Sequence, residues 1–182
     1  ISDIYDVPVD VDNTTGDISY EGNIIVHGNV RAGFTLKASG DITIMGVVEG
    51  ANVDAGGNVM VNRGIQGMNK AVVHAGGDIT TKFVENATVS CGGSIETDSL
   101  LHCSTSAGDK INVSGKNGLL VGGTARAGST VTAKQIGNNM GTVTNVYVGV
   151  DPALLKSVKE LAAEITKANS DRTKLRQVVA AL

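Results

Sequence analysis

Apolar and polar residues alternate along most of the chain, and the alternation restarts every 16 to 20 residues. Alternation with a period of two predicts a strand that buries one face. The restart is marked by one recurring apolar position, occupied by Ile24, Ile42, Val59, Ile79, Ile95 and Ile111. A self-similar repeat of this length predicts a solenoid, in which each repeat forms one coil and packs against its neighbours.

A second alternating run follows in each period, with small, apolar and small residues at its inward positions. It recurs at residues 34–38, 51–55, 71–75, 87–91, 103–107 and 129–133. Coils of a β-solenoid stack about 4.8 Å apart, so like residues lie over like residues in a narrow interior. The pattern predicts an all-β solenoid of about six coils at residues 22–150. Variable corners are expected at 46–50, 63–70, 82–86 and 98–102, with a long insertion at Gly115–Arg126.

Both ends of the array depart from the repeat. Residues 1–21 are acidic, and we interpret them as a lead-in strand that caps one end; a disordered terminus is the alternative. Residues 142–150 are expected to form a closing strand pair or cap. The chain opens on Ile rather than Met, which indicates a fragment of a longer protein.

The period changes after Asp151-Pro152, a favourable pair for starting a helix. Apolar residues then follow a 4-3-4-3 spacing, interrupted by Arg172, at Leu154, Val158, Leu161, Ile165, Ala168, Leu175, Val179 and Leu182. This spacing predicts a helix at 151–182 with coiled-coil character. Such a helix is marginal alone. Its partner is expected to be another helix, the flank of the solenoid or a second copy.

Composition narrows the possible functions. Charged residues are 18% of the chain, aromatic residues 3%, and the net charge is −3. The basic footprint of a nucleic-acid-binding protein is absent. No apolar run reaches the roughly 18 residues that span a membrane, and no signal peptide is visible. Residues 151–182 carry six Lys and Arg against four Asp and Glu, whereas the rest of the chain is acidic, so the tail is a separate piece.

The glycine pairs and the cysteines fit structural roles. Each Gly-Gly pair precedes a strand, whereas a phosphate-binding loop needs a helix N-terminus behind it. We therefore interpret the pairs as corners. Cys91 and Cys103 occupy positions that hold Ala in other repeats, which predicts small core side chains, too far apart for a disulfide.

Outward positions of the second run form a ladder. Lys37, Asp54 and His74 align with one another, and the alignment continues through Ser90, Ser106 and Thr132. His27 and His102 are also expected at the surface. No set of residues forms a catalytic, cofactor-binding or metal-ligating constellation.

Five motifs, in order, resemble the flagellar assembly protein A (FapA) family. They are Thr15–Ile18, Gly46–Ala51, Lys82–Ala87, Gly115–Gly123 and Val148–Pro152. The resemblance covers about residues 7–155. It implies a right-handed parallel β-helix in a bacterial cytoplasmic protein that assists assembly or placement of polar flagella, without a catalytic site. The coils are also similar in style to the C-terminal domain of MinC and to bactofilins, which self-associate.

The sequence thus favours a non-enzymatic scaffold that binds a protein through the solenoid and pairs through its helix, with a homodimer as one form of this pairing. A self-assembling cytoskeletal or division-related unit is the alternative. A carbohydrate-active enzyme would need carboxylates clustered roughly 5–10 Å apart, and the ladders show none in consecutive coils.

Overall fold

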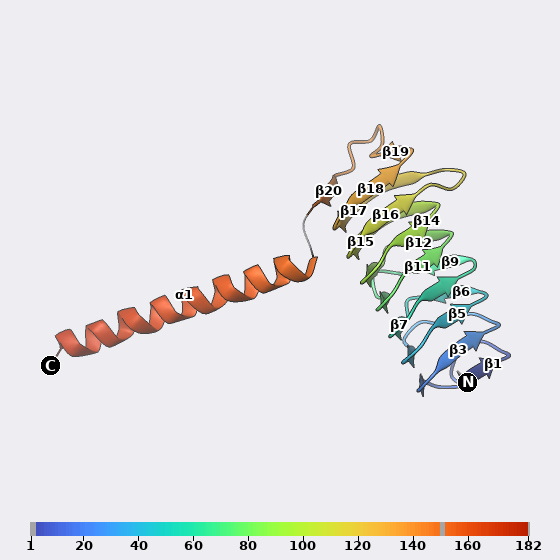
Figure 1. Cartoon of the computed structure of the whole chain (residues 1–182), viewed down its shortest axis with the longest axis horizontal. Coiled ribbons are helices and arrows are strands. Elements are labelled where there is room, and N and C mark those ends of the chain that lie inside the picture. The colour runs from blue at the N-terminus through green and yellow to red at the C-terminus, as the bar shows by residue number, and fades with distance from the viewer. Residues whose placement is uncertain (1–2, 150–151, 182) are drawn as a thin grey trace.

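The computed structural model describes residues 3–149 and 152–181. Within them, short parallel strands stack into a solenoid, and a 29-residue helix, α1 (Pro152–Ala180), follows. Figure 1 shows the coils side by side and the helix standing apart from them. The predicted fold class, an all-β solenoid followed by a helix, is confirmed.

One sheet runs the length of the solenoid and contributes one strand to each coil. Its eight parallel strands are β1 (Ile4–Val7), β3 (Asn23–Val26), β5 (Ile42–Ile44), β8 (Val59–Val61), β11 (Ile79–Thr81), β14 (Ile95–Thr97), β16 (Lys110–Val113) and β18 (Thr130–Ala133). The prediction of about six coils is therefore too low. Residues 3–21 supply an additional coil, because β1 pairs in parallel with β3, and β18 belongs to another.

The second alternating run forms a second side of the solenoid. Its strands are β2 (Ile18–Tyr20), β4 (Thr35–Ala38), β7 (Asn52–Ala55), β10 (Val72–Ala75), β13 (Thr88–Cys91), the C-terminal halves of β15 (Ser99–Ala107) and β17 (Leu119–Ala127), and β20 (Thr144–Val148). The sequence pattern assigned residues 129–133 to this second run. That assignment is wrong, because Val131 pairs with Ile111 of the first sheet. The second run of that coil is instead Gly123–Ala127, opposite Cys103–Ala107.

The expected variable corners contain a third strand. These strands are β6 (Val47–Glu49), β9 (Gly64–Gln66), β12 (Phe83–Glu85), the N-terminal halves of β15 and β17, and β19 (Gln135–Ile136). The insertion expected at Gly115–Arg126 is wrong, because most of it is the regular strand β17. Short strands with a single inward residue leave little alternation to detect, which is why the sequence pattern hid this side.

Columns of like residues fill the interior. The central residue of each third-side strand continues such a column, and Val48, Ile65 and Val84 are all fully buried. Ile42 and Ile79, in an inward column of the first sheet, are also fully buried. Because each side chain packs on the like side chain of the adjacent coils, the repeat itself builds the core.

Steric contacts between coils explain the Gly-Gly pairs. The side-chain oxygen of Asn58 accepts a 2.8 Å hydrogen bond from the backbone N–H of Asp78 in the next coil. A Cβ on Gly77 would lie 2.2 Å from that oxygen. Likewise, a Cβ on Gly76 would lie 2.2 Å from the Gly56 carbonyl oxygen. Both glycines of the pair are therefore required by close approach between coils.

The same contact recurs in successive coils. Side-chain oxygens of Asn23, Asp41, Asn58 and Asp78 each accept a backbone N–H from the like position of the next coil, at 2.7 to 2.8 Å. We call these four residues the corner ladder. Ser94 follows Asp78, and its shorter side chain leaves room for a Cβ. The pair accordingly becomes Gly108-Asp109 in the next coil.

The two ends of the solenoid differ. At the first coil the rings of Tyr5 and Tyr20 lie 5.3 Å apart, in columns that hold Ile and Ala farther along. At the last coil Ile136, Val146 and Val148 continue inward columns, yet they are 52%, 36% and 47% exposed. Aromatic side chains thus cover one end, whereas aliphatic core positions at the other end stay exposed in the described part of the chain.

Candidate functional site

The second side of the solenoid presents two parallel columns of outward residues. We call this surface the ladder face; it comprises Lys37, Asp54, His74, Ser90, Ser106, Arg126 and Tyr147 in one column and Thr35, Asn52, Val72, Thr88, Ser104, Thr124 and Asn145 in the other. Strand pairing sets these residues in register, so side chains of consecutive coils are neighbours. The sequence alignment placed Thr132 here. That is wrong, because Thr132 lies opposite Asn112 in the first sheet.

Contacts along the ladder face join consecutive coils. The Lys37 Nζ atom lies 3.9 Å from the Asp54 Oδ2 atom, and both side chains are about half exposed. The His74 Nδ1 atom lies 3.0 Å from the Ser90 Oγ atom. These are surface contacts, each worth less than about 1 kcal/mol. They join side chains of consecutive coils without burying charge.

A shallow depression lies in the middle of the ladder face. Its volume is about 400 Å³, and its lining is Asn52, Val53, Asp54, Val72 and His74. Val72 is 46% exposed there, between polar neighbours. An exposed apolar side chain with a carboxylate and an imidazole beside it can contact a protein surface through both polar and apolar groups.

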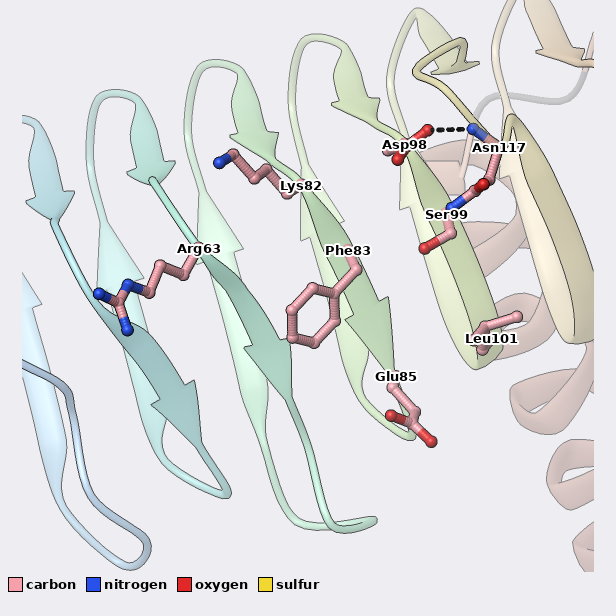
Figure 2. A pocket seen from close by; sticks show the side chains of 8 residues that line it. All are labelled: Arg63, Lys82, Phe83, Glu85, Asp98, Ser99, Leu101 and Asn117. Carbon is pink, nitrogen blue, oxygen red and sulfur yellow. Dashed lines mark hydrogen bonds between the residues drawn. The ribbon is translucent and has the colours of Figure 1, made fainter.

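A larger hollow lies on the third side, and the sequence did not single it out. Its volume is about 550 Å³. Its lining residues, shown in Figure 2, are Arg63, Lys82, Phe83, Glu85, Asp98, Ser99, Leu101 and Asn117. Phe83 is one of two Phe residues in the chain. A Cβ on Gly64 would lie 2.3 Å from the Phe83 ring, so glycine makes room for it. Aromatic residues are rare in this chain, and the presence of Phe83 was the only sequence feature that could have indicated the hollow.

The charged side chains around the hollow differ in how far they are engaged in hydrogen bonds. The Asp98 carboxylate accepts hydrogen bonds from the backbone N–H groups of Asn117 and Gly118, at 2.8 and 3.3 Å. It therefore holds a turn. Arg63 and Lys82 are exposed at the rim of the hollow. The basic side chains, unlike Asp98, remain available to an incoming group.

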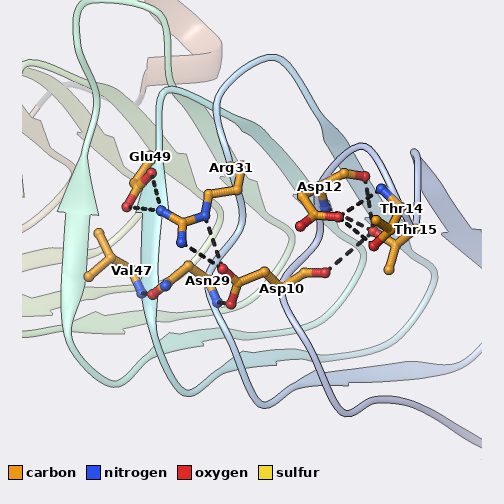
Figure 3. A network of polar contacts seen from close by, with 8 residues as sticks. All are labelled: Asp10, Asp12, Thr14, Thr15, Asn29, Arg31, Val47 and Glu49. Carbon is orange, nitrogen blue, oxygen red and sulfur yellow. Dashed lines mark hydrogen bonds and ion pairs between the residues drawn. The ribbon is translucent and has the colours of Figure 1, made fainter.

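A polar network binds the first three coils together (Figure 3). The Arg31 guanidinium contacts Asp10 at 2.7 Å and Glu49 at 3.0 Å, one coil to each side. The backbone N–H of Asn29 lowers the pKa of Asp10, and the hydrogen bond from Arg31 adds to this effect. The Asn29 side chain accepts from the Val47 N–H at 2.8 Å. We interpret this network as structural, since its groups satisfy one another.

Both cysteines lie in the core. Cys91 stacks between Ala75 and Ala107, and Cys103 lies opposite Gly123; both thiols are free. Burial raises the pKa of the Cys91 thiol to about 11, and it also raises the pKa of Cys103. A protonated, buried thiol is a poor nucleophile. These residues act as small apolar side chains.

The residues of α1 at the 4-3-4-3 positions, which we call the seam, do not reach the core. Val158, Leu161, Ile165, Leu175 and Val179 are between 54% and 70% exposed. Ala168 and Arg172 are exposed too. Leu182 and the side chain of Leu154 lie outside the described residues. The structure thus brings five large apolar side chains to one exposed helix face and leaves them without an apolar cover among the described residues.

Among the described residues, no three His, Cys, Asp or Glu side chains converge in a way that could hold a metal ion. No helix in the described part of the chain combines the length and the hydropathy needed to cross a membrane.

Comparison with known proteins identifies the family. No match is found among curated proteins or solved structures. The model of one family, the Flagellar Assembly Protein A beta solenoid domain, matches residues 3–182, which includes the coils and the helix. The match covers nearly the whole chain, and it agrees with the stacked parallel coils. The chain therefore belongs to the FapA family.

Proposed function

We propose that this chain is a non-enzymatic scaffold of flagellar assembly, which binds a protein partner through the ladder face and pairs through its helix. Membership in the FapA family carries the proposal, since it ties the chain to flagellar assembly. The ladder face adds a site: a regular surface with alternating charged, hydroxyl and imidazole groups. Such a surface gives a partner many hydrogen-bonding groups in fixed positions.

The shallow depression at the centre of the ladder face is the proposed anchor point. Asp54 and His74 lie in register on adjacent coils beside the exposed Val72. A central apolar contact with a polar surround is the arrangement that carries most of the energy at protein interfaces. We expect the partner to place an apolar side chain on Val72 and a basic group near Asp54.

The test uses the native bacterium with substitutions on the chromosome. Asp54→Lys with His74→Glu reverses the charge pattern of the depression. The matched control is Met60→Glu with Thr80→Lys, exposed on adjacent coils of the first sheet. We expect cells with the ladder variant to lose flagella in electron micrographs, whereas control cells keep them. Normal flagella in both strains would contradict docking at the ladder face.

A third strain tests the hollow on the third side as the docking site instead. It carries Phe83→Ala with Lys82→Glu, which disrupts this hollow. Loss of flagella in this strain would place partner docking at the hollow.

We place the protein in the bacterial cytoplasm, with enrichment at the cell pole where polar flagella are built. Imaging of a fluorescent fusion tests this placement, and a signal spread evenly through the cell would contradict polar enrichment.

Self-assembly is the second candidate, because the last coil is open. The exposed Ile136, Val146 and Val148 continue inward columns and could pack on another molecule. Tyr5 and Tyr20 cover the opposite end, so stacking would join two open ends and then stop. We therefore expect no filaments under negative-stain microscopy, and long filaments would favour the self-assembling alternative over the scaffold.

A further inference from the structure

The exposed apolar face of α1 follows the heptad rule of a coiled coil. In this register Val158, Ile165, Arg172 and Val179 occupy the a positions. The d positions hold Leu161, Ala168 and Leu175. β-Branched residues at a together with Leu at d favour two parallel strands over trimers or tetramers. Apart from the short Ala168 and the charged Arg172, the described seam fits this rule.

We propose that α1 pairs with α1 of a second copy, in a parallel and in-register two-stranded coiled coil. The inference rests on the helix pairing of the proposed function and names its partner, orientation and register. The exposed area of the seam side chains, each more than half exposed, is the surface that pairing would bury. A helix with only one narrow apolar face is marginal in water until that face is covered.

Charge determines the orientation. The g positions carry the acids Glu164 and Asp171, and the e position of the last heptad carries Arg176. A parallel coil brings g of one helix to the next e of the other, so Asp171 meets Arg176 of the second copy twice per dimer. An antiparallel coil brings g to g. Since the g positions hold no base, acids would then face acids or neutral residues.

Arg172 determines the register. In register, its two copies share one layer, where each guanidinium can reach Asp171 of the other helix while the aliphatic stem stays on the seam. A shift of one heptad would set Arg172 against Ile165 or Val179 of the second copy. Opposite Ile165, Arg172 could still reach Glu164, but opposite Val179 the adjacent g residue is Val178. One of the two Arg172 side chains would then be buried unpaired among apolar side chains, which is costly. A single polar a residue commonly fixes register in this way, at some expense of stability.

Parallel pairing has a consequence for the solenoid. Both helices begin at the C-terminal end of their coils, so a parallel dimer holds two solenoids at the same end of the coiled coil. Two ladder faces are then tethered together. A partner with two binding sites would gain avidity without any new contact.

Disulfide cross-linking of the whole 182-residue chain tests the orientation. The background is Cys91→Ala with Cys103→Ala, since Ala already fills like positions of other coils. Leu175→Cys places a thiol at d, next to its own copy only in a parallel in-register dimer. Ser170→Cys, at the outer f position, is the matched control. We expect a covalent dimer for the first variant and none for the second.

Sedimentation equilibrium of the same proteins separates the possible failures. A dimer that cannot be cross-linked at residue 175 would overturn the parallel arrangement and leave helix pairing in place. A monomer would overturn pairing between copies, whereas the ladder-face substitutions test partner docking independently. A trimer mass would overturn the two-stranded coil. Circular dichroism confirms that each variant keeps its fold.

Charge reversal gives a second, independent test. Arg176→Glu turns both Asp171–Arg176 pairs into repulsive ones, and we expect Kd of the dimer to rise roughly tenfold. Asp171→Lys alone would be repulsive toward both Arg172 and Arg176 of the other helix. The double variant restores attraction between positions 171 and 176 with the charges exchanged, so its Kd should be lower than the two single changes predict by additivity. Lys159→Glu, at an outer b position, is the control. Equal Kd values for all variants would overturn the proposed orientation.

Discussion

The coils bury their apolar residues, whereas the helix exposes its own. Ile79 of β11 is fully buried, because Val59 and Ile95 lie in register on the adjacent coils. Ile165 of α1 is 61% exposed, although the sequence pattern around it is just as regular. A solenoid covers its apolar residues with its own repeats, whereas a single amphipathic helix must obtain its cover from elsewhere.

The difference separates stability from association. The coils hold the core residues of the described chain, and none of them comes from α1. Substitutions in the coils should therefore lower the free energy of unfolding. Substitutions on the helix seam should change association and leave the unfolding of the coils nearly unchanged.

The largest effect is expected from Ile79→Ala. Removing a fully buried Ile side chain leaves a cavity between two coils and should cost about 2–5 kcal/mol in the free energy of unfolding. Urea denaturation followed by circular dichroism at a β wavelength measures this. The matched variant Ile165→Ala should leave that transition in place. A similar loss for both variants would contradict the separation between coils and helix.

The next effect concerns the corner ladder. Gly77→Ala would push its Cβ against the Asn58 side chain and break the hydrogen bond to the Asp78 N–H. The cost should be about 1–3 kcal/mol. Asn58→Ser removes the obstructing group, so the double variant should be more stable than additivity of the two single changes predicts. Strict additivity would contradict the steric account of the Gly-Gly pairs.

A pH-dependent effect is expected from Cys91. Burial raises the folded-state pKa of its thiol from an ordinary 9.0 to about 11, so the folded protein holds this proton more tightly than the unfolded chain does. Stability should be unaffected below pH 9 and should fall as pH rises from about 9 to about 11. Urea midpoints of the wild type and of Cys91→Ala measure it. An equal decline in both proteins would assign the loss to other groups.

The smallest effect is expected on the ladder face. Lys37→Ala removes a contact of 3.9 Å between exposed groups and should change the free energy of unfolding by less than about 1 kcal/mol. The measurement is the same urea titration. A larger loss would mean that the ladder face contributes to the fold, which would weaken its interpretation as a surface kept for binding.

Strict alternation made the first two sides of the solenoid predictable. Ile42 and Ile79 on one side, and Leu36 and Val53 on the other, mark inward columns that pairing in the structure reproduces. The third side was not predictable in this way, because its strands carry one inward residue each. The glycines of Gly115–Arg126 also resemble loop residues, although Gly122 and Gly123 serve a bend inside β17, with φ of 73° and 77°.

The candidate sites were predictable to different degrees. Lys37, Asp54 and His74 follow from the repeat alone, since outward positions alternate with inward ones. The Phe83 hollow depends on the third side and on the space above Gly64, so the alternation pattern could not reveal it, and the rarity of Phe was the one signal left. The open last coil was also hidden, because exposure of Ile136 depends on where the stack ends rather than on local sequence.

The central claim is that the coils fold without a second molecule, whereas the helix requires one. Sedimentation equilibrium of the intact chain and of a chain lacking residues 151–182 tests it most directly. We predict a dimer for the intact chain, and a monomer with unchanged β circular dichroism for the truncated one. Equal masses for the two proteins, or loss of the β signal on truncation, would contradict the account.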